Sequence, residues 1–338
     1  MIRALIGVVA ALVLAGLGWT GWWFAAASGQ EAAIDAWLED RRARGWLAEA
    51  EVAIQGFPTR FERRLEGLEL VDPRAGWAWN APRLDVGSDA WDPTYLAIAF
   101  PNEQTLAVPG ERLRIEAERL AAVAAVVPSL SLQLREVSVE ADDLRLAATA
   151  GWQTGAERVR MAVTRRTDDS APDNTYDIRL QAQGVSLPGF LGRALTPADA
   201  AEPPLGVLDA TGMVVTDRPV DRDALERGDI GAETVVVRRG TLTYGRIAFL
   251  VDGRLDADAA GFAEGSVDIE ARDWKRLLEG LVASGTLNPN VAEGIRGALR
   301  IVTLFNSGDD LALTLSFAEG RTLLGPVAIG EAPRMKPR

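Results

Sequence analysis

Apolar and polar residues alternate along much of this 338-residue chain, and this period of two constrains its fold more than any other feature. The alternation is clear at Leu96, Ile98 and Phe100, and it recurs strictly from Leu311 to Phe317. Successive side chains of a β-strand point to opposite faces of a sheet, so such alternation is typical of half-buried strands. Short turns that contain Gly separate many of the runs, as expected for hairpins. The sequence therefore predicts a mainly β fold built from antiparallel sheets.

The apolar phase of the strands shifts at two points. Between Leu65 and Leu68 it slips across Gly67, and a second slip falls near Pro82. Such slips indicate β-bulges, which bend sheets, so we expect extended, curved sheets that form a groove or an open barrel-like body. Apolar strand residues would line that groove, at Leu96, Ile98, Phe100, Leu113 and Ile115. The alternative, that these residues belong to an ordinary core, stays open at this point.

The N-terminus carries a second strong constraint. No charged residue occurs from Ala4 to Gln30, and the run from Leu5 to Ala27 is largely apolar. A helix of about 20 apolar residues can span the core of a bilayer, so we expect residues 1–29 to form a membrane anchor. Aromatic side chains at the far end of this run suit the membrane–water interface; they are Trp19, Trp22, Trp23 and Phe24.

The charges around this run suggest an orientation. Arg3 precedes it, and the positive-inside rule then places the N-terminus in the cytoplasm. We therefore expect a single-pass membrane protein whose body is exported from the cytoplasm. The alternative is a cleaved signal peptide, because Ala25-Ala26-Ala27-Ser28 offers small-residue cleavage sites. The apolar region of a signal peptide is usually only about 7–15 residues long, which favours the uncleaved anchor.

Departures from the β pattern predict how the chain divides. Helical spacing of Ile34, Trp37 and Leu38 predicts a helix over residues 30–44 that continues from the anchor. Two apolar stripes near the end of the chain predict a helical hairpin that packs on a sheet. The expected parts are a first β half at 30–185, a Pro-rich connection at 186–205, a second β half at 206–330 with the hairpin at 274–306, and a frayed tail at 331–338.

Composition narrows the functional classes. Lys and Arg total 36 against 48 Asp and Glu, a net charge of −12, and nucleic acid binding would need a basic surface. The chain has no His and no Cys, so disulfides, ordinary zinc sites and Ser-His-Asp or Cys-His catalysis are impossible. We therefore predict no catalytic residues, no metal site and no cofactor. Chemistry based on carboxylate pairs is the least favoured alternative.

Several motifs resemble a known bacterial family. They are Gly56-Phe57-Pro58-Thr59-Arg60-Phe61, Leu70-Val71-Asp72-Pro73, Trp77-Ala78-Trp79, Phe100-Pro101-Asn102-Glu103-Gln104-Thr105-Leu106, Trp274 with Leu277-Leu278, Leu313-Thr314-Leu315 and Gly325-Pro326-Val327-Ala328-Ile329-Gly330. With these motifs the chain resembles the domain of unknown function 2125 family (DUF2125) over most of its length beyond the anchor. The motifs consist of turns and strands and carry no catalytic set, so this resemblance implies no function.

A second resemblance concerns the layout alone. An anchor followed by a long β-rich body is similar in style to the AsmA-like envelope proteins, which implies a role in lipid transport or outer-membrane homeostasis. With the bacterial resemblance, we expect a non-enzymatic, single-pass protein of the bacterial inner membrane with its body in the periplasm. It would bind or handle a lipid or another amphiphile in the cell envelope. The alternative is an envelope scaffold without a ligand. The expected partners are the membrane and a lipid, not nucleic acid.

Overall fold

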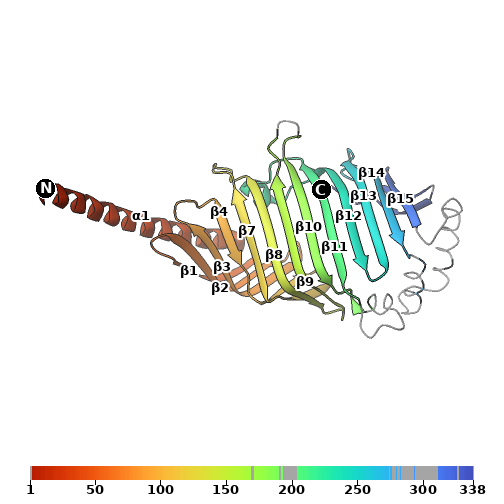
Figure 1. The fold of residues 1–338 in the computed structure, drawn as a ribbon, viewed down its shortest axis with the longest axis horizontal. Coiled ribbons are helices and arrows are strands. Elements are labelled where there is room, and N and C mark those ends of the chain that lie inside the picture. Colours follow the sequence, from red (N-terminus) through yellow and green to blue (C-terminus); the bar gives the residue numbers. More distant parts are fainter. Residues whose placement is uncertain are drawn as a thin grey trace. The chain divides into compact units, whose positions relative to one another are not determined.

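The computed structural model describes residues 2–168, 171–189, 204–273, 311–325 and 327–337, together with the single positions 192, 275, 279, 282 and 293. One long helix, α1 (Ile2–Ala43), is followed by an antiparallel sheet of 17 strands (Figure 1). Strands that follow one another in sequence mostly pair with each other, as β1 pairs with β2 and β13 with β14. The prediction of a mainly β, antiparallel fold is therefore confirmed.

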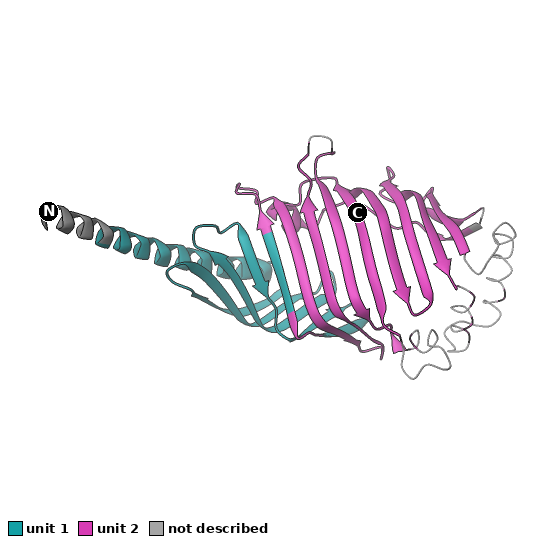
Figure 2. Ribbon diagram, viewed as in Figure 1, with its two compact units in different colours: residues 1–115, 120–124 teal, residues 116–119, 125–338 magenta. Residues whose placement is uncertain are grey.

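The chain forms two compact units (Figure 2). Unit 1 comprises residues 1–115 and 120–124, and unit 2 comprises residues 116–119 and 125–338. The strands up to the boundary region are β1 (Leu47–Gln55), β2 (Arg60–Asp72), β3 (Trp77–Asp89), β4 (Tyr95–Ala99), β5 (Glu103–Val108), β6 (Glu111–Glu116) and β7 (Arg119–Val126).

The remaining elements belong to unit 2. They are β8 (Leu134–Ala148), β9 (Gln153–Arg165), β10 (Thr175–Val185), β11 (Gly206–Thr216), α3 (Arg222–Arg227), β12 (Ala232–Tyr244), β13 (Ile247–Ala257), β14 (Ala263–Arg272), β15 (Leu311–Ala318), β16 (Arg321–Leu324) and β17 (Val327–Glu331).

In unit 1, α1 covers one face of β1, β2 and β3. Leu38 is buried in a cluster with Leu68 and Leu70, and Trp23 is buried against Phe61. The predicted helix over residues 30–44 is thus confirmed, with its end one residue earlier. Gly45 follows it at φ 87°, a left-handed conformation that glycine adopts readily after a helix.

The irregularity predicted at Gly67 is present. The register between β1 and β2 shifts where Glu49 pairs with Glu69 and Glu51 pairs with Glu66, and Gly67 has φ 62°. This break lets Leu65 and Leu68 join one apolar cluster although three positions separate them. A bulge therefore explains the slip in apolar phase.

The predicted division into two β halves joined by residues 186–205 stays a prediction, since residues 190–191 and 193–203 lie outside the described part of the chain. The strands on either side of this segment, β10 and β11, pair from Thr175↔Val215 to Val185↔Gly206. A hydrogen-bonded ladder thus continues across this segment within unit 2. The compact units meet between residues 115 and 125.

The C-terminal tail is tied down rather than frayed. Ala332 is 5% exposed and belongs to a cluster with Ala263 and Phe317. The backbone N–H of Met335 donates to Gly261 and its carbonyl accepts from Ala232, at 2.8 Å in each case. The prediction of a frayed tail at 331–338 is wrong for residues 332–336, because their backbone groups form hydrogen bonds with the chain around β12, β14 and β15.

Two other predictions concern regions that are only partly described. Most of the helical hairpin expected at 274–306 lies outside the described residues, apart from the single positions given above. Within the described part of the chain, no helix is both long enough and apolar enough to cross a membrane. The side chains of residues 1–12, which begin the predicted anchor, lie outside the described part.

Candidate functional site: the apolar face of unit 2

The strand registers of unit 2 bring apolar side chains onto one face of the sheet. Val163 of β9 pairs with both Val137 and Ile178, and cross-strand partners in an antiparallel sheet point to the same side. A neighbouring row on the same face, two residues further along β10, passes through the pairs Leu180↔Ala210, Ala210↔Gly240, Gly240↔Val251, Val251↔Ile269 and Ile269↔Leu313.

We call this surface the apolar face of unit 2. Its larger residues are Val137, Val139, Met161, Val163, Ile178, Leu180, Val214, Val235, Val237, Val251, Leu255, Val267, Ile269, Leu313 and Leu315. All of them are half-buried. Leu255, Val267, Leu313 and Leu315 pack beside clusters of buried residues, and in the described part of the chain the others belong to no such cluster. A layer packed on top would bury such side chains almost completely.

The opposite face of the same strands is polar and more exposed. Arg160 and Arg179, next to Met161 and Leu180 in sequence, are both exposed. Asp177 accepts hydrogen bonds from Arg166 and Arg238 at 2.7 Å each. These two guanidinium groups lower the pKa of the Asp177 carboxyl, with Arg166 as the larger cause. The two faces thus differ in polarity in the way that alternation along each strand requires.

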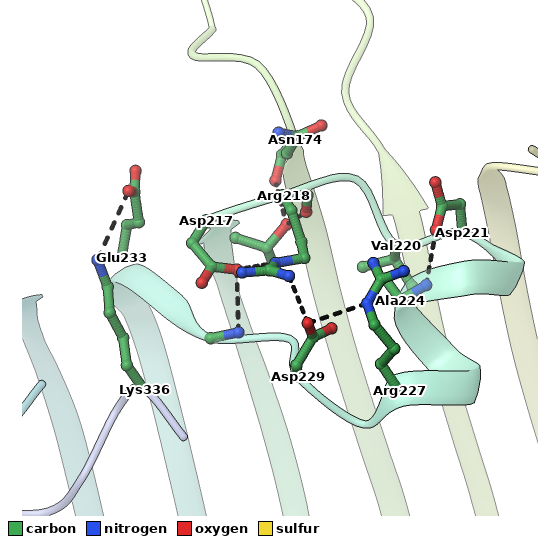
Figure 3. Close-up of polar contacts among 12 residues, drawn as sticks. Asn174, Asp217, Arg218, Val220, Asp221, Ala224, Arg227, Asp229, Glu233 and Lys336 are labelled. Atoms are coloured by element: carbon green, nitrogen blue, oxygen red, sulfur yellow. Dashed lines mark hydrogen bonds and ion pairs between the residues drawn. The ribbon is translucent and has the colours of Figure 1, made fainter. Parts of the chain in front are cut away.

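One end of the apolar face is closed by the connection between β11 and β12. The backbone N–H of Val220 donates to the hydroxyl of Tyr176, which is only 1% exposed. In Figure 3, Asp229 accepts from Arg218 at 2.5 Å and from Arg227 at 3.0 Å. Both guanidinium groups pair with Asp229 Oδ2, whereas Arg218 Nε and Asp229 Oδ1 are buried without a hydrogen-bond partner. Because the charges of this network offset one another, we assign it a structural role in holding the connection over the strand ends.

The other end is closed by apolar residues from two connections. Leu187 packs on buried Tyr244 and Ile247. Val282 packs on Ala271 and Leu311, the pair that joins β14 to β15. Between these two closed ends the face keeps its half-buried side chains.

Charged side chains of unit 2 also gather outside this face. An open depression is lined by Glu118, Arg119, Asp142, Asp143, Glu157 and Arg158. Arg119 Nε donates to Asp142 Oδ2 at 2.9 Å, so this depression holds paired charges. In the part of the chain that is described, no group of three or more acidic residues is placed to hold a metal ion.

The residues predicted to line a groove lie in unit 1. Leu96 and Ile98 of β4 and Leu113 and Ile115 of β6 are half-buried, while Ala97 and Ala99 between them are exposed. Phe100 follows β4, and its ring centroid lies 6.3 Å from that of Trp79. Although alternation is present there as expected, these residues are not part of the apolar face of unit 2. The sequence did show the alternation in β8–β13, but the registers that join it into one face have no local sequence signal.

The four aromatic residues predicted at a membrane interface have different environments. Trp23 is 2% exposed and its ring stacks on Phe61, with centroids 5.3 Å apart. Trp19, Trp22 and Phe24 are exposed. The Trp19 indole N–H donates to the carbonyl of Pro58 at 2.9 Å. Trp23 therefore packs within the protein, and the other three keep exposed apolar surface.

Comparison with known proteins identifies a family. The family model described as "Uncharacterized protein conserved in bacteria (DUF2125)" matches residues 23–333, nearly the whole chain. The chain therefore belongs to this family, as its turn and strand motifs predicted. No curated protein and no solved structure matches it.

Proposed function

We propose that this member of the DUF2125 family binds the acyl chain of a lipid or another amphiphile on the apolar face of unit 2. The observation that carries the proposal is the apolar face of unit 2, whose half-buried side chains extend from β8 to β15. Large contiguous apolar surfaces on soluble proteins usually mark interaction sites. Removing such surface from water stabilises a complex by about 25 cal/mol per Å².

The shape of the row suits a chain-like ligand. Consecutive strands lie about 4.8 Å apart, so a row over eight strands offers an apolar track on the order of 30 Å long. Gly240 and Gly253 lie within this face and leave its surface locally without a side chain. An extended acyl chain could contact many of these strands, whereas a compact polar ligand would leave most of the apolar face exposed to water.

We further propose that α1 anchors the protein in the bacterial inner membrane with its body in the periplasm, without enzymatic activity. The support is the uncharged run from Ala4 to Gln30. The exposed apolar side chains at Val13, Leu14 and Leu17 add to it. An anchored lipid-handling protein stays close to its source of ligand. The alternative is an envelope scaffold without a ligand, and the following experiment distinguishes the two functions.

The experiment compares substitutions on the two faces of one strand. Leu180→Asp puts a carboxylate into the apolar face, and Arg179→Asp puts the same group on the polar face one residue earlier. Fluorescence titration of the full chain with a dansyl-labelled fatty acid should show at least about a tenfold loss of affinity for Leu180→Asp only, because a buried charge is costly. Mass spectrometry of lipids that co-purify with the native chain gives a second readout.

Folding must be checked in parallel. If circular dichroism shows that Leu180→Asp unfolds, Leu180→Gln provides a neutral polar substitution of similar size. Equal binding by both faces, or no lipid bound to the native chain, would contradict lipid binding and favour the scaffold.

A further inference from the structure

We infer that the turn between β1 and β2 is a second membrane contact, which inserts Phe57 into the interfacial layer of a phospholipid bilayer beside α1. This inference rests on the proposed anchoring of α1. Four exposed aromatic residues would then contact lipid. They are Trp19, Trp22, Phe24 and Phe57, which we call the aromatic platform.

Hydrogen bonds and ring contacts fix the turn between β1 and β2 to the part of α1 around Trp19–Phe24. Besides the hydrogen bond from Trp19 to Pro58, the indole N–H of Trp23 donates to the carbonyl of Arg60 at 3.1 Å. The Phe57 ring stacks on Phe24 with centroids 5.6 Å apart, and it meets the Trp23 ring edge-on at 5.5 Å. The turn and this part of α1 therefore form one rigid surface within unit 1.

This surface remains open although its interior is packed. Trp22 is 47% exposed, Phe24 56% and Phe57 45%. The exposed apolar surface continues along α1 toward the N-terminus, where Leu14 and Leu17 are 68% and 64% exposed. A well-packed aromatic cluster that still exposes this much apolar surface is suited to a partner that is itself apolar.

The length of α1 sets the depth of the turn. The 18 residues from Ile2 to Trp19 make about 27 Å of helix, slightly less than the hydrocarbon core of about 30 Å. If α1 spans the bilayer, the apolar layer must reach the level of Trp19. The turn bonded to Trp19 then lies at the edge of that layer, where aromatic rings are favoured.

The lack of charge favours lipid over a protein partner. No charged residue lies between Ala4 and Gln30, and the turn sequence Gly56-Phe57-Pro58-Thr59 has none either. Charged and polar side chains usually surround the apolar centre of a protein–protein interface. The first nearby charge beyond the turn is Arg60, whose guanidinium lies 3.8 Å from Glu62 and 3.9 Å from Asp89.

A two-point contact would also fix the orientation of unit 1. A single helix that crosses a bilayer can rotate about its own axis and can tilt. Insertion of Phe57 on one side of α1 removes the rotation, because turning the helix would lift the turn out of the lipid. The same side of unit 1 would then always face the membrane.

The test uses the absence of native cysteine, so that a single introduced cysteine can carry a nitroxide label. Phe57→Cys is compared with Leu14→Cys on α1 and with Leu47→Cys, since Leu47 is 42% exposed and lies at the end of β1 opposite to the turn. The full chain is placed in vesicles of phosphatidylethanolamine and phosphatidylglycerol. Electron paramagnetic resonance then measures collisions of each label with oxygen, which concentrates in lipid, and with a water-soluble nickel complex.

We expect the ratio of oxygen to nickel collisions at Phe57→Cys to exceed that at Leu47→Cys several-fold. A label at Phe57→Cys that is as exposed to water as the one at Leu47→Cys, with Leu14→Cys in lipid, would overturn the second contact and leave the anchor intact. A wet label at Leu14→Cys as well would overturn both. If Phe57→Cys does not fold, Thr59→Cys probes the same turn and must give the same lipid-facing result.

Discussion

Both units contain strands with alternating apolar and polar residues, but the apolar side chains are buried to different extents. In unit 1, α1 lies on the face, and Phe61 and Leu68 are only 1% and 3% exposed. In unit 2, Val163 and Leu180 occupy equivalent alternating positions and remain half-buried. The difference lies in whether a second element packs on the sheet, because the strands themselves are equally regular.

This contrast distinguishes apolar surface that stabilises the fold from apolar surface that is available to bind a ligand. Apolar side chains that a helix covers contribute to folding, because they leave water when the chain folds. Half-buried side chains have completed only part of that transfer, and a ligand can complete the rest. We therefore assign the covered face of unit 1 to the fold and propose the face of unit 2 for the ligand.

The largest expected effect is on the covered face. Phe61→Ala should lower the free energy of unfolding by about 3–5 kcal/mol, because it opens a cavity beneath α1. Leu180→Ala in unit 2 should cost only about 1 kcal/mol, since Leu180 already contacts water. Denaturant unfolding of the two variants measures both values. Similar losses would mean that the faces are covered to the same extent.

A smaller effect is expected where α1 meets the first strand. The guanidinium of Arg41 lies 5.0 Å from the ring centroids of both Trp37 and Trp46, and the residue is 8% exposed. Arg41→Lys loses planar stacking and should cost about 1–2 kcal/mol. The matched control is Arg44→Lys, which keeps an exposed ion pair with Asp40 and should cost less than about 0.5 kcal/mol. If thermal melting gave the same shift for both, the stacking would have no special role.

A third substitution asks how far the chain covers its own apolar face in unit 2. Val282 packs beside Ala271 and Leu311, and Glu279 is exposed. We expect the predicted hairpin at 274–306 to dock there, so Val282→Ala should cost about 1 kcal/mol and Glu279→Ala almost nothing. Leu281→Ala, on the predicted apolar stripe, should exceed both. Negligible effects from all three would indicate an undocked segment and would extend the open part of the face.

The smallest expected effect is on the polar face. Hydrogen bonds from Arg166 and Arg238 lower the pKa of Asp177 in the folded chain. This carboxylate therefore stabilises the fold above its unfolded pKa of about 3.9, and the contribution is lost as the pH falls through the lower folded pKa. Asp177→Asn should remove that part of the acid sensitivity, by less than about 1 kcal/mol, because both side chains are partly exposed and solvent screens the pair. Unfolding measured from pH 6 down to about pH 2 would test it; an unchanged acid limb would exclude Asp177 as a contributor.

Local patterns predicted the elements but not their assembly. Alternation at Leu96–Phe100 and Leu311–Phe317, the bulge at Gly67 and the helix that contains Leu38 were all readable, because each depends on neighbouring residues. The apolar face of unit 2 depends on registers such as Val251↔Ile269, which many distant contacts decide together. The burial of Trp23 was missed for the same reason, since its partner Phe61 lies in another element.

The tied tail has a consequence for the order of events during synthesis. Met335 bonds to Ala232 and Gly261, Pro333 accepts a hydrogen bond from Ala263, and Arg334 lies over the Phe262 ring at 4.4 Å. These tail residues leave the ribosome after β12, β13 and β14. The nascent chain therefore emerges with three backbone groups in this region that still lack their partners. Unit 2 can therefore close this region only after translation has passed residue 336. A chain that stops before residue 336 would leave these backbone groups unpaired, and such incompletely folded chains are prone to aggregation.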